Sequence, residues 1–225
     1  KKEHVPAKDI FLLFLASFFA LTLNQLPFFV GLSMTSPIDA SIVVTMLPIL
    51  TMILAAIIIK EPITLMKSVG VVVGASGALL LVFSSQMQHT GNGNFWGNLI
   101  VFSAAFSFAI YLTVFKDLIT RYSPVTLMKW MFLFAAIIGT SIYWRHISTF
   151  DFTNTPMTAY WKIAYVVVGA TFCTYLLIPI AQKSLRPTTL SMYNYLQPIV
   201  ASFIAFMYGM DTFGWVQILA AVLVF

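Results

Sequence analysis

The side chains that could do chemistry in this sequence are uncharged, and they lie inside long apolar stretches. Amides and phenols both donate and accept hydrogen bonds, which suits the binding of amino acids or amphipathic organic solutes. No Lys or Arg lies well inside an apolar stretch, which disfavours phosphorylated solutes. The candidate solute-binding residues are Asn24, Gln25, Tyr111, Tyr175, Tyr193, Asn194 and Gln197.

The stretch YNYLQP concentrates these groups near the end of the sequence. Asn194 and Gln197 stand three residues apart and share one face of a helix, and Tyr193 lies one turn from Gln197. Burying an amide without a partner costs about 1–3 kcal/mol, so this face should avoid lipid. The amides then either hydrogen-bond to a neighbouring helix or line a watery cavity, and we favour the cavity.

The reactive residue types in the sequence give no indication of catalysis. His4, His89 and His146 all lie outside the apolar stretches, and no His, Cys, Asp or Glu cluster has the spacing of metal ligands. The sequence contains neither a nucleophile elbow nor a phosphate-binding loop. The acidic residues stand at the ends of apolar stretches or between them, so no proton relay is visible. We therefore expect no enzyme activity, no catalytic residue, no metal and no cofactor.

The elements that must position the candidates are membrane helices. Of the 225 residues, 60% are hydrophobic and 8% are charged, against about 45–50% and about 25% in ordinary globular chains. A soluble fold could not hide this much apolar surface, so we predict an all-α, polytopic transmembrane helix bundle. The eight apolar segments cover residues 10–32, 38–59, 68–84, 96–115, 126–144, 160–182, 188–208 and 213–225.

The basic residues indicate how these segments are oriented. If residues 1–9 are cytoplasmic and each segment crosses once, ten Lys and Arg residues fall inside, whereas only Arg145 and Lys162 fall outside. This is the positive-inside bias of membrane proteins. The basic residues form no face fit for phosphates, so the net charge of +5 does not indicate nucleic acid binding. We expect a multi-pass protein of the cell inner (plasma) membrane.

Two stretches of the sequence match at a constant offset of 150 residues. The stretch that begins at Ser36 aligns without a gap with the stretch that begins at Arg186. Five crossings separate the two starts, so the second copy is inverted in the membrane, as in many secondary transporters. The matched pairs are Pro37 with Pro187, Ser41 with Ser191, Pro48 with Pro198, Ala55 with Ala205, and Glu61 with Asp211.

This match predicts two inverted-topology repeats of five helices, of which about eight spans are present in the sequence. We assign residues 1–84 to helices 3–5 of the first repeat and residues 96–225 to helices 6–10 of the second. Extending the first repeat by the same offset predicts about 55 further residues, enough for two helices, before Lys1. The segment at 213–225 is too short to cross a bilayer, so we expect it to be truncated.

Pro48 and Pro198 are predicted to kink the matched helices, because each lacks a backbone donor. As a symmetric pair they could bend around a central cavity or serve packing alone, and we favour the cavity. The second copy carries its rings and amides where the first copy has Val43, Val44, Thr45 and Leu47. We therefore assign solute selectivity to the second copy.

For the small residues inside the apolar segments, we expect structural roles. Ser103 and Thr45 lie inside apolar segments, where small hydroxyls commonly bond to their own backbone. Gly70, Gly74 and Gly77 follow a small-xxx-small pattern that lets helices approach closely. We expect these glycines to pack within the bundle rather than to form a dimer.

Three stretches carry a resemblance to a known family: SPIDASIVVTMLPILTMILAAIIIKEPIT, VGVVVGASGALLLV and LRPTTLSMYNYLQPIVASFIAFMYGMD. They resemble the EamA-type exporters of the drug/metabolite transporter superfamily, and the likeness extends over the whole sequence. The resemblance implies two EamA repeats, each with a proline-containing fourth helix, a following acid and a glycine-rich fifth helix. Asp211 departs from the pattern, since Glu is commoner at that position.

We predict a secondary transporter that works by alternating access on small metabolites, amino acids or drug-like solutes. The outward direction is implied by the resemblance alone. The alternative is a non-transporting membrane scaffold or subunit of the same fold, in which the polar residues only lock helices together. The expected partners are a small-molecule solute and the lipid bilayer, with no nucleic acid, and the sequence leaves monomer and dimer open.

Overall fold

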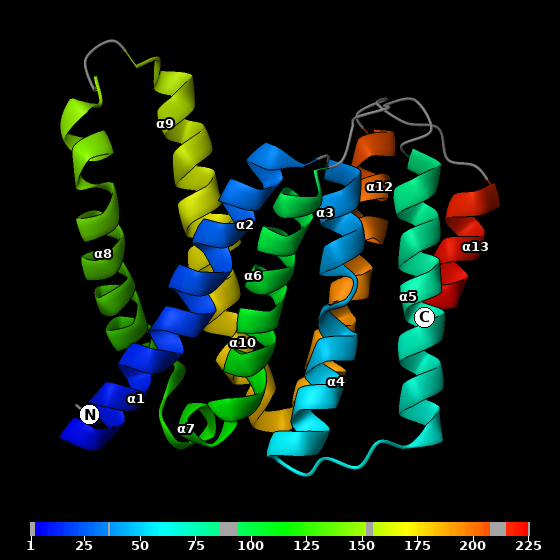
Figure 1. Cartoon of the computed structure of the whole chain (residues 1–225), viewed down its shortest axis with the longest axis horizontal. Helices are drawn as coiled ribbons and strands as arrows, with labels where there is room; N and C mark the ends of the chain where they lie inside the picture. Colours follow the sequence, from blue (N-terminus) through cyan, green and yellow to red (C-terminus); the bar gives the residue numbers. More distant parts are fainter. Residues whose placement is uncertain (1–2, 36, 86–93, 152–154, 208–214, 225) are drawn as a thin grey trace. The chain divides into compact units, whose positions relative to one another are not determined.

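The computed structural model describes residues 3–35, 37–85, 94–151, 155–207 and 215–224 (Figure 1). These residues are helical apart from short links and contain no strand, so the predicted all-α class is confirmed. Each predicted apolar segment coincides with one helix or with consecutive helical pieces. The pieces are α1 (Ala7–Ser17), η1 (Phe18–Thr22), α2 (Leu23–Met34), α3 (Pro37–Val44), α4 (Leu47–Ile58), α5 (Leu65–Ser85), α6 (Phe95–Val114), α7 (Lys116–Arg121), α8 (Pro124–Thr149), α9 (Met157–Ala164), η2 (Tyr165–Cys173), α10 (Thr174–Ser184), α11 (Pro187–Met192), η3 (Tyr193–Tyr195), α12 (Leu196–Met207) and α13 (Trp215–Val224).

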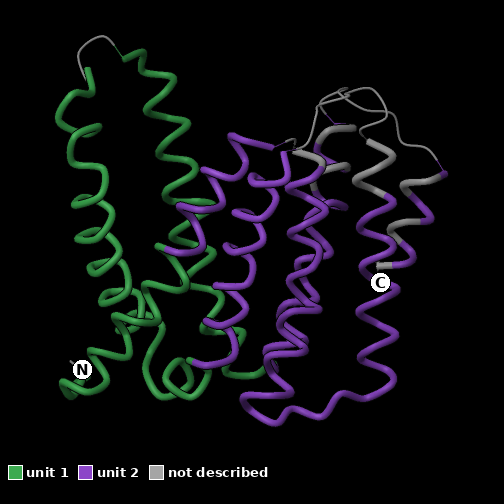
Figure 2. Tube along the Cα trace, viewed as in Figure 1, with its two compact units in different colours: residues 1–22, 115–185 green, residues 23–114, 186–225 purple. Residues whose placement is uncertain are grey.

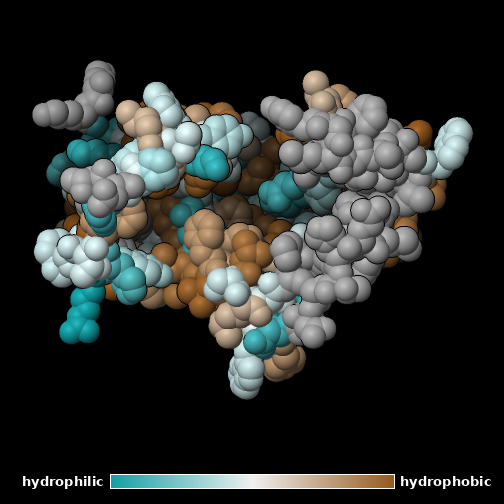
Figure 3. All heavy atoms as spheres, turned by 90° about the horizontal axis from the view of Figure 1, so that it is seen from above, coloured by the Kyte–Doolittle hydropathy of each residue, from teal (hydrophilic) through white to brown (hydrophobic). Residues whose placement is uncertain are grey.

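Five helical segments are long and apolar enough to cross a membrane, and α5 adds a shorter apolar stretch over Leu65–Leu80. Large apolar side chains stay exposed along them, for example Leu133, Ile137 and Ile142 on α8, as expected of helices in lipid. Seen from above, onto the helix ends, hydrophilic residues are exposed among the hydrophobic ones (Figure 3). The protein is therefore a multi-pass membrane protein. The five segments are Ala7–Met34, Asp39–Ile58, Phe95–Val114, Pro124–Thr149 and Met157–Ser184.

The chain divides into two compact units, which are described one at a time (Figure 2). Unit 1 comprises residues 1–22 and 115–185, and unit 2 comprises residues 23–114 and 186–225. Each unit therefore takes helices from both predicted repeats.

In unit 1, α1 packs against α8, and α10 packs against α7 and α8. The hydroxyl of Ser17 donates to the carbonyl of Met131 at 2.6 Å, and Leu13 and Met131 are fully buried. The short helix α7 was not predicted, because its six residues lie in a link too short and too charged to stand out as an apolar segment. It nevertheless buries Leu118 and Ile119 in the unit.

Unit 1 also contains two stretches of π-helix, η1 and η2, which the sequence did not predict. Residues 18–22 of η1 map onto residues 168–172 by the offset of 150, and these lie inside η2. The π-helix is rare in proteins overall, but where it occurs it is often at a functional site. The two copies thus share a backbone irregularity as well as their prolines.

Unit 2 places α6 against α2, α3 and α4. α2 and α6 approach closely, because a Cβ on Gly31 would lie 2.7 Å from the carbonyl oxygen of Gly97. The hydroxyl of Thr35 donates to the side-chain oxygen of Asn98 at 2.6 Å, next to this crossing. α3 and α4 run in the opposite direction to α11 and α12, which is consistent with an inverted repeat (Figure 1).

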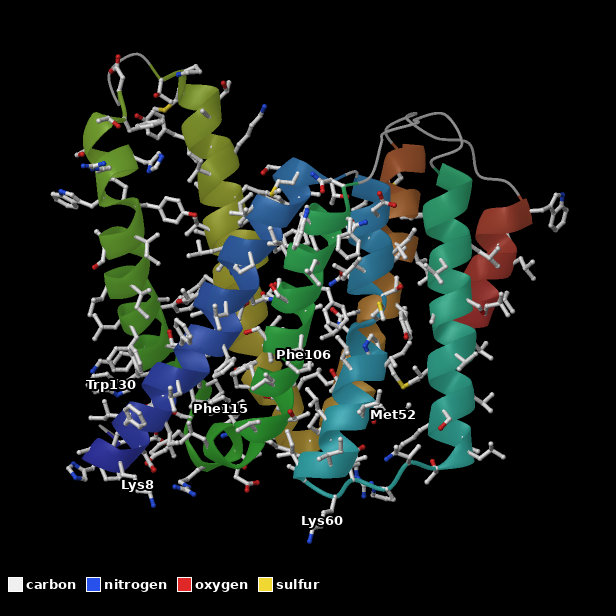
Figure 4. The ribbon with its side chains drawn as sticks, viewed as in Figure 1. Lys8, Met52, Lys60, Phe106, Phe115 and Trp130 are labelled. Atoms are coloured by element: carbon white, nitrogen blue, oxygen red, sulfur yellow. The ribbon has the colours of Figure 1, made fainter. Side chains whose placement is uncertain are left out.

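The end of α4 is closed by a left-handed turn. Lys60 has a φ of 54°, and its side chain projects from the link to α5 (Figure 4). The N–H groups of Ile59 and Glu61 both bond to the carbonyl of Ala55, which satisfies the last turn of the helix. The buried carboxylate of Glu61 accepts from Lys67 Nζ at 2.9 Å. Asp211, the predicted counterpart of Glu61, lies outside the described residues.

Candidate functional site

The candidate site is built on the two helices of unit 2 that contain the matched prolines Pro48 and Pro198, and α11 packs against α4 there. Each helix is interrupted just before its proline. In the first copy the N–H of Met46 bonds to the carbonyl of Val43 at 3.0 Å, and α4 begins at the next residue. In the second copy the N–H of Leu196 bonds to the carbonyl of Tyr193, three residues back, within the 3₁₀ segment η3.

These two bonds occupy matched positions, since 43 and 46 become 193 and 196 with the offset of 150. The cause is the same in both copies. A proline has no N–H for the carbonyl four residues before it, and its ring clashes with that carbonyl. The chain therefore tightens before each proline, in a single turn before Pro48 and in the 3₁₀ segment η3 before Pro198.

The 3₁₀ winding places residues three apart on one line, because a 3₁₀ helix has three residues per turn. We call Ser191, Asn194 and Gln197 the amide line. Gln197 Nε2 donates to Asn194 Oδ1 at 3.0 Å, and Asn194 Nδ2 donates to the carbonyl of Ser191 at 2.9 Å. Both amide bonds stay within this helical segment. Asn194 is half-buried, whereas Gln197 and Tyr193 are exposed, with Tyr193 at 55%.

A second line, of Met192 and Tyr195, faces α5. A Cβ on Gly70 would lie 3.1 Å from the methyl group of Met192, and one on Gly74 would lie 2.6 Å from Cδ2 of Tyr195. Three residues of 3₁₀ helix and four residues of α-helix both rise about 6 Å, so the two spacings match. Gly70 and Gly74 thus pack within the chain, as expected.

Tyr195 is the residue of this site that the sequence did not single out as a candidate. It is only 2% exposed, and its hydroxyl has no hydrogen-bond partner among the residues that the structure describes. Leaving a buried polar group unpaired costs about 1–3 kcal/mol. The offset could have drawn attention to it, because its counterpart Thr45 also carries a hydroxyl at the interruption.

Three other candidates lie in unit 2, on α2 and α6. Asn24 Nδ2 donates to the carbonyl of Ala104 at 3.0 Å and so joins these helices. Gln25 is half-buried on α2. Tyr111 is fully buried on α6, with its ring 5.7 Å from that of Phe108.

The remaining candidate, Tyr175, lies in unit 1. Its hydroxyl donates to the carbonyl of Ala20 at 2.7 Å, and its ring meets Phe132 edge to face. It joins α10 to the π-helical segment η1. The structure therefore brings six of the seven candidates into unit 2 and places the seventh in unit 1.

The small hydroxyls behave as expected. Ser103 Oγ donates to the carbonyl of Ile100 at 2.7 Å, and Thr45 Oγ1 donates to the carbonyl of Ile42 at 2.6 Å. Both bonds stay within one helical turn, so neither hydroxyl needs a partner from elsewhere.

Charged side chains meet at one end of unit 1. The buried carboxylate of Asp9 accepts from Arg121 at 3.0 Å and from the hydroxyl of Tyr122. That hydrogen bond raises the pKa of Tyr122, because it stabilises the protonated phenol. This cluster fastens α1 to the link between α7 and α8. Among the residues that the structure describes, no group of three or more His, Cys, Asp and Glu could hold a metal ion.

Comparison with known proteins places the chain in a family. A model described as the EamA-like transporter family matches residues 1–83 and 95–225. The transporter YyaM of Bacillus subtilis, which is named as uncharacterized, is 25% identical over 88% of this chain and 65% of its own. An uncharacterized transporter of Archaeoglobus fulgidus is 30% identical over 56% of this chain and 43% of its own. The chain thus spans less than two thirds of the length of these relatives.

A solved crystal structure of a protein has the same fold, with a TM-score of 0.78 and 15% identity. The alignment covers 98% of this chain and 74% of that one. The family match extends over most of the sequence and over both copies of the interrupted helix. The chain therefore belongs to the EamA-like transporter family.

Proposed function

We propose that the protein is a secondary transporter that exports small organic solutes by alternating access, with amino acids as the first class to examine. Relatives in two organisms are named as transporters, although as uncharacterized ones. The observation that carries the proposal is the pair of matched interruptions in helices that run in opposite directions. Binding sites of inverted-repeat carriers lie at such broken helices.

The solute class follows from the chemistry of the second copy. Its amide line offers hydrogen-bond donors and acceptors without a net charge. Tyr193 adds an exposed ring at the same place, against which an apolar part of a solute can pack. No Lys or Arg lies within α11, η3 or α12, so a phosphate group has no charged partner there.

The interruptions also suit the motion that alternating access needs. A helix that is already broken can change direction at the break without losing further hydrogen bonds. We place the protein in the plasma membrane, with residues 1–84 and 96–225 as its two repeats, and we expect no enzyme activity.

The test is efflux from proteoliposomes that contain the full-length protein and are loaded with a mixture of the twenty L-amino acids. We expect faster efflux of at least one amino acid than from protein-free liposomes. Asn194→Leu and Gln197→Leu should each slow that efflux about fivefold, which is the loss of one hydrogen bond of about 1 kcal/mol.

Ser103→Ala is the matched control, because it removes an exposed hydroxyl that bonds only to its own helix. It should leave efflux unchanged. No efflux of any amino acid by folded protein would contradict the proposal and favour the alternative of a membrane scaffold. Normal efflux by both Leu variants would remove the amide line from the site.

A further inference from the structure

We propose that the hydroxyl of Tyr195 is a specificity-determining hydrogen-bond donor that selects solutes carrying an acceptor oxygen, such as a carboxylate or a carbonyl group. The inference rests on the proposed transport function and adds a residue outside the amide line. Tyr195 closes the 3₁₀ segment η3, one residue after Asn194.

The ring of Tyr195 is held in place by its packing. Gly74 leaves the space that the ring fills, since a Cβ there would lie 2.6 Å from Cδ2 and 2.9 Å from Cε2. Met192 fills the corresponding space at Gly70, one turn earlier. The ring thus packs against α5 at Gly74, and this contact positions the hydroxyl.

The hydroxyl of Tyr195 has no hydrogen-bond partner among the residues that the structure describes, although the residue is almost fully buried. The matched residue in the first copy gives the contrast. The hydroxyl of Thr45 is satisfied by the carbonyl of Ile42, one turn back in its own helix. A phenol cannot make this bond, because its oxygen lies at the far end of a rigid ring. The second copy therefore presents a donor that none of the described residues satisfies and that a molecule from outside can satisfy.

The contact with α5 determines when this donor can be used. η3 rests on α5, and a solute reaches the buried hydroxyl once the two have moved apart. Alternating access supplies such a conformation. While η3 rests on α5, which we call the closed contact, the hydroxyl has no partner among the described residues. In the open contact, with the two moved apart, it bonds to the solute. A solute with an acceptor oxygen therefore shifts the equilibrium toward the open contact, because a ligand favours the state to which it binds better.

The experiment compares Tyr195→Phe with wild type in the full-length protein. The probes are the L-amino acid with the fastest efflux and the amine that lacks its carboxylate. The variant keeps the ring against Gly74 and loses only the oxygen. We expect the KM for the amino acid to rise at least fivefold, and the preference for the amino acid over the amine to fall by a similar factor. The Tm without solute should stay the same or rise, because an unpaired group is removed.

Thr45→Val is the matched control, since its hydroxyl is satisfied within the helix, and its KM should equal that of wild type. An unchanged KM in Tyr195→Phe would overturn this inference and leave the transporter function intact. A Tm that falls by several degrees with an unchanged preference would show an internal partner and overturn it too. Absence of efflux of every loaded amino acid by wild type would contradict the proposed function, and this inference with it.

Discussion

The two interrupted helices of unit 2 share a backbone and differ in their side chains. Before Pro48 the first copy has a tight turn flanked by Val43, Val44 and Leu47, and the hydroxyl of Thr45 bonds to its own helix. Before Pro198 the second copy has the same turn, but the flanking residues are amides and tyrosines. One copy is thus apolar where the other carries hydrogen-bonding groups.

The comparison separates two roles that are easily confused. The break itself follows from the proline and is common to both copies, so it belongs to the architecture. The hydrogen-bonding groups belong to one copy, so we propose that they carry selectivity. Substitutions at matched positions can test this division, because each copy supplies the control for the other.

The largest effect is expected where the second copy meets α5. Gly74→Ala places a methyl group against the ring of Tyr195 and should destabilise the protein by about 1–3 kcal/mol, as overpacking does. Gly139→Ala on α8 is the control, because a Cβ there meets nothing within 4 Å. The measurement is the midpoint of thermal unfolding in detergent. Equal midpoints for the two variants would mean that the contact between η3 and α5 is looser than described.

Reciprocal exchange of Leu47 and Gln197 tests whether the side chains are interchangeable. Leu47 is buried, so Leu47→Gln should cost about 1–3 kcal/mol by burying an amide without a partner. Gln197 is exposed and donates one hydrogen bond, so Gln197→Leu should cost only about 0.6 kcal/mol. Equal costs in free energy of unfolding, measured by thermal unfolding, would show that both copies provide the same environment. They would contradict the division of roles between the two copies.

Restoring the missing backbone donors should have similar effects in both copies. Pro48→Ala and Pro198→Ala each supply an N–H to the carbonyl four residues back and allow the α-helix to continue. One added bond of about 1 kcal/mol should slow amide exchange near residues 46 and 196 about fivefold. Hydrogen exchange followed by mass spectrometry measures this. A change in only one copy would show that something other than proline holds the other break open.

The smallest effect is expected for hydroxyls that bond within their own turn. Thr45→Val and Ser191→Ala remove bonds to the carbonyls of Ile42 and Thr188, at 2.6 and 2.8 Å. Each should change the free energy of unfolding by less than about 0.5 kcal/mol. The amide line should survive Ser191→Ala, because Asn194 bonds to the carbonyl of Ser191 and not to its hydroxyl. A larger loss of stability in either variant would mean that its hydroxyl also holds another helix.

Much of the fold could be predicted from the sequence, because lipid makes long apolar runs into helices and because Pro48 and Pro198 interrupt theirs. The shared face of Asn194 and Gln197 could also be predicted, because residues three apart lie on one face of a helix. The contact of Tyr195 with α5 could not, because it depends on the 3₁₀ winding of η3. The π-helical segments η1 and η2 have no characteristic residue composition from which they could be predicted. The helix α7 is too short to show a hydrophobic pattern.

The winding of η3 has a mechanical consequence. Each residue turns the chain by about 120° in a 3₁₀ helix and by about 100° in an α-helix, with rises of about 2.0 and about 1.5 Å. If Tyr193–Tyr195 rewound into α-helix, α12 would rotate by about 60° relative to α11 and draw in by about 1.5 Å. A change of winding in these three residues would thus rotate the side chains of α12 while α11 keeps its position.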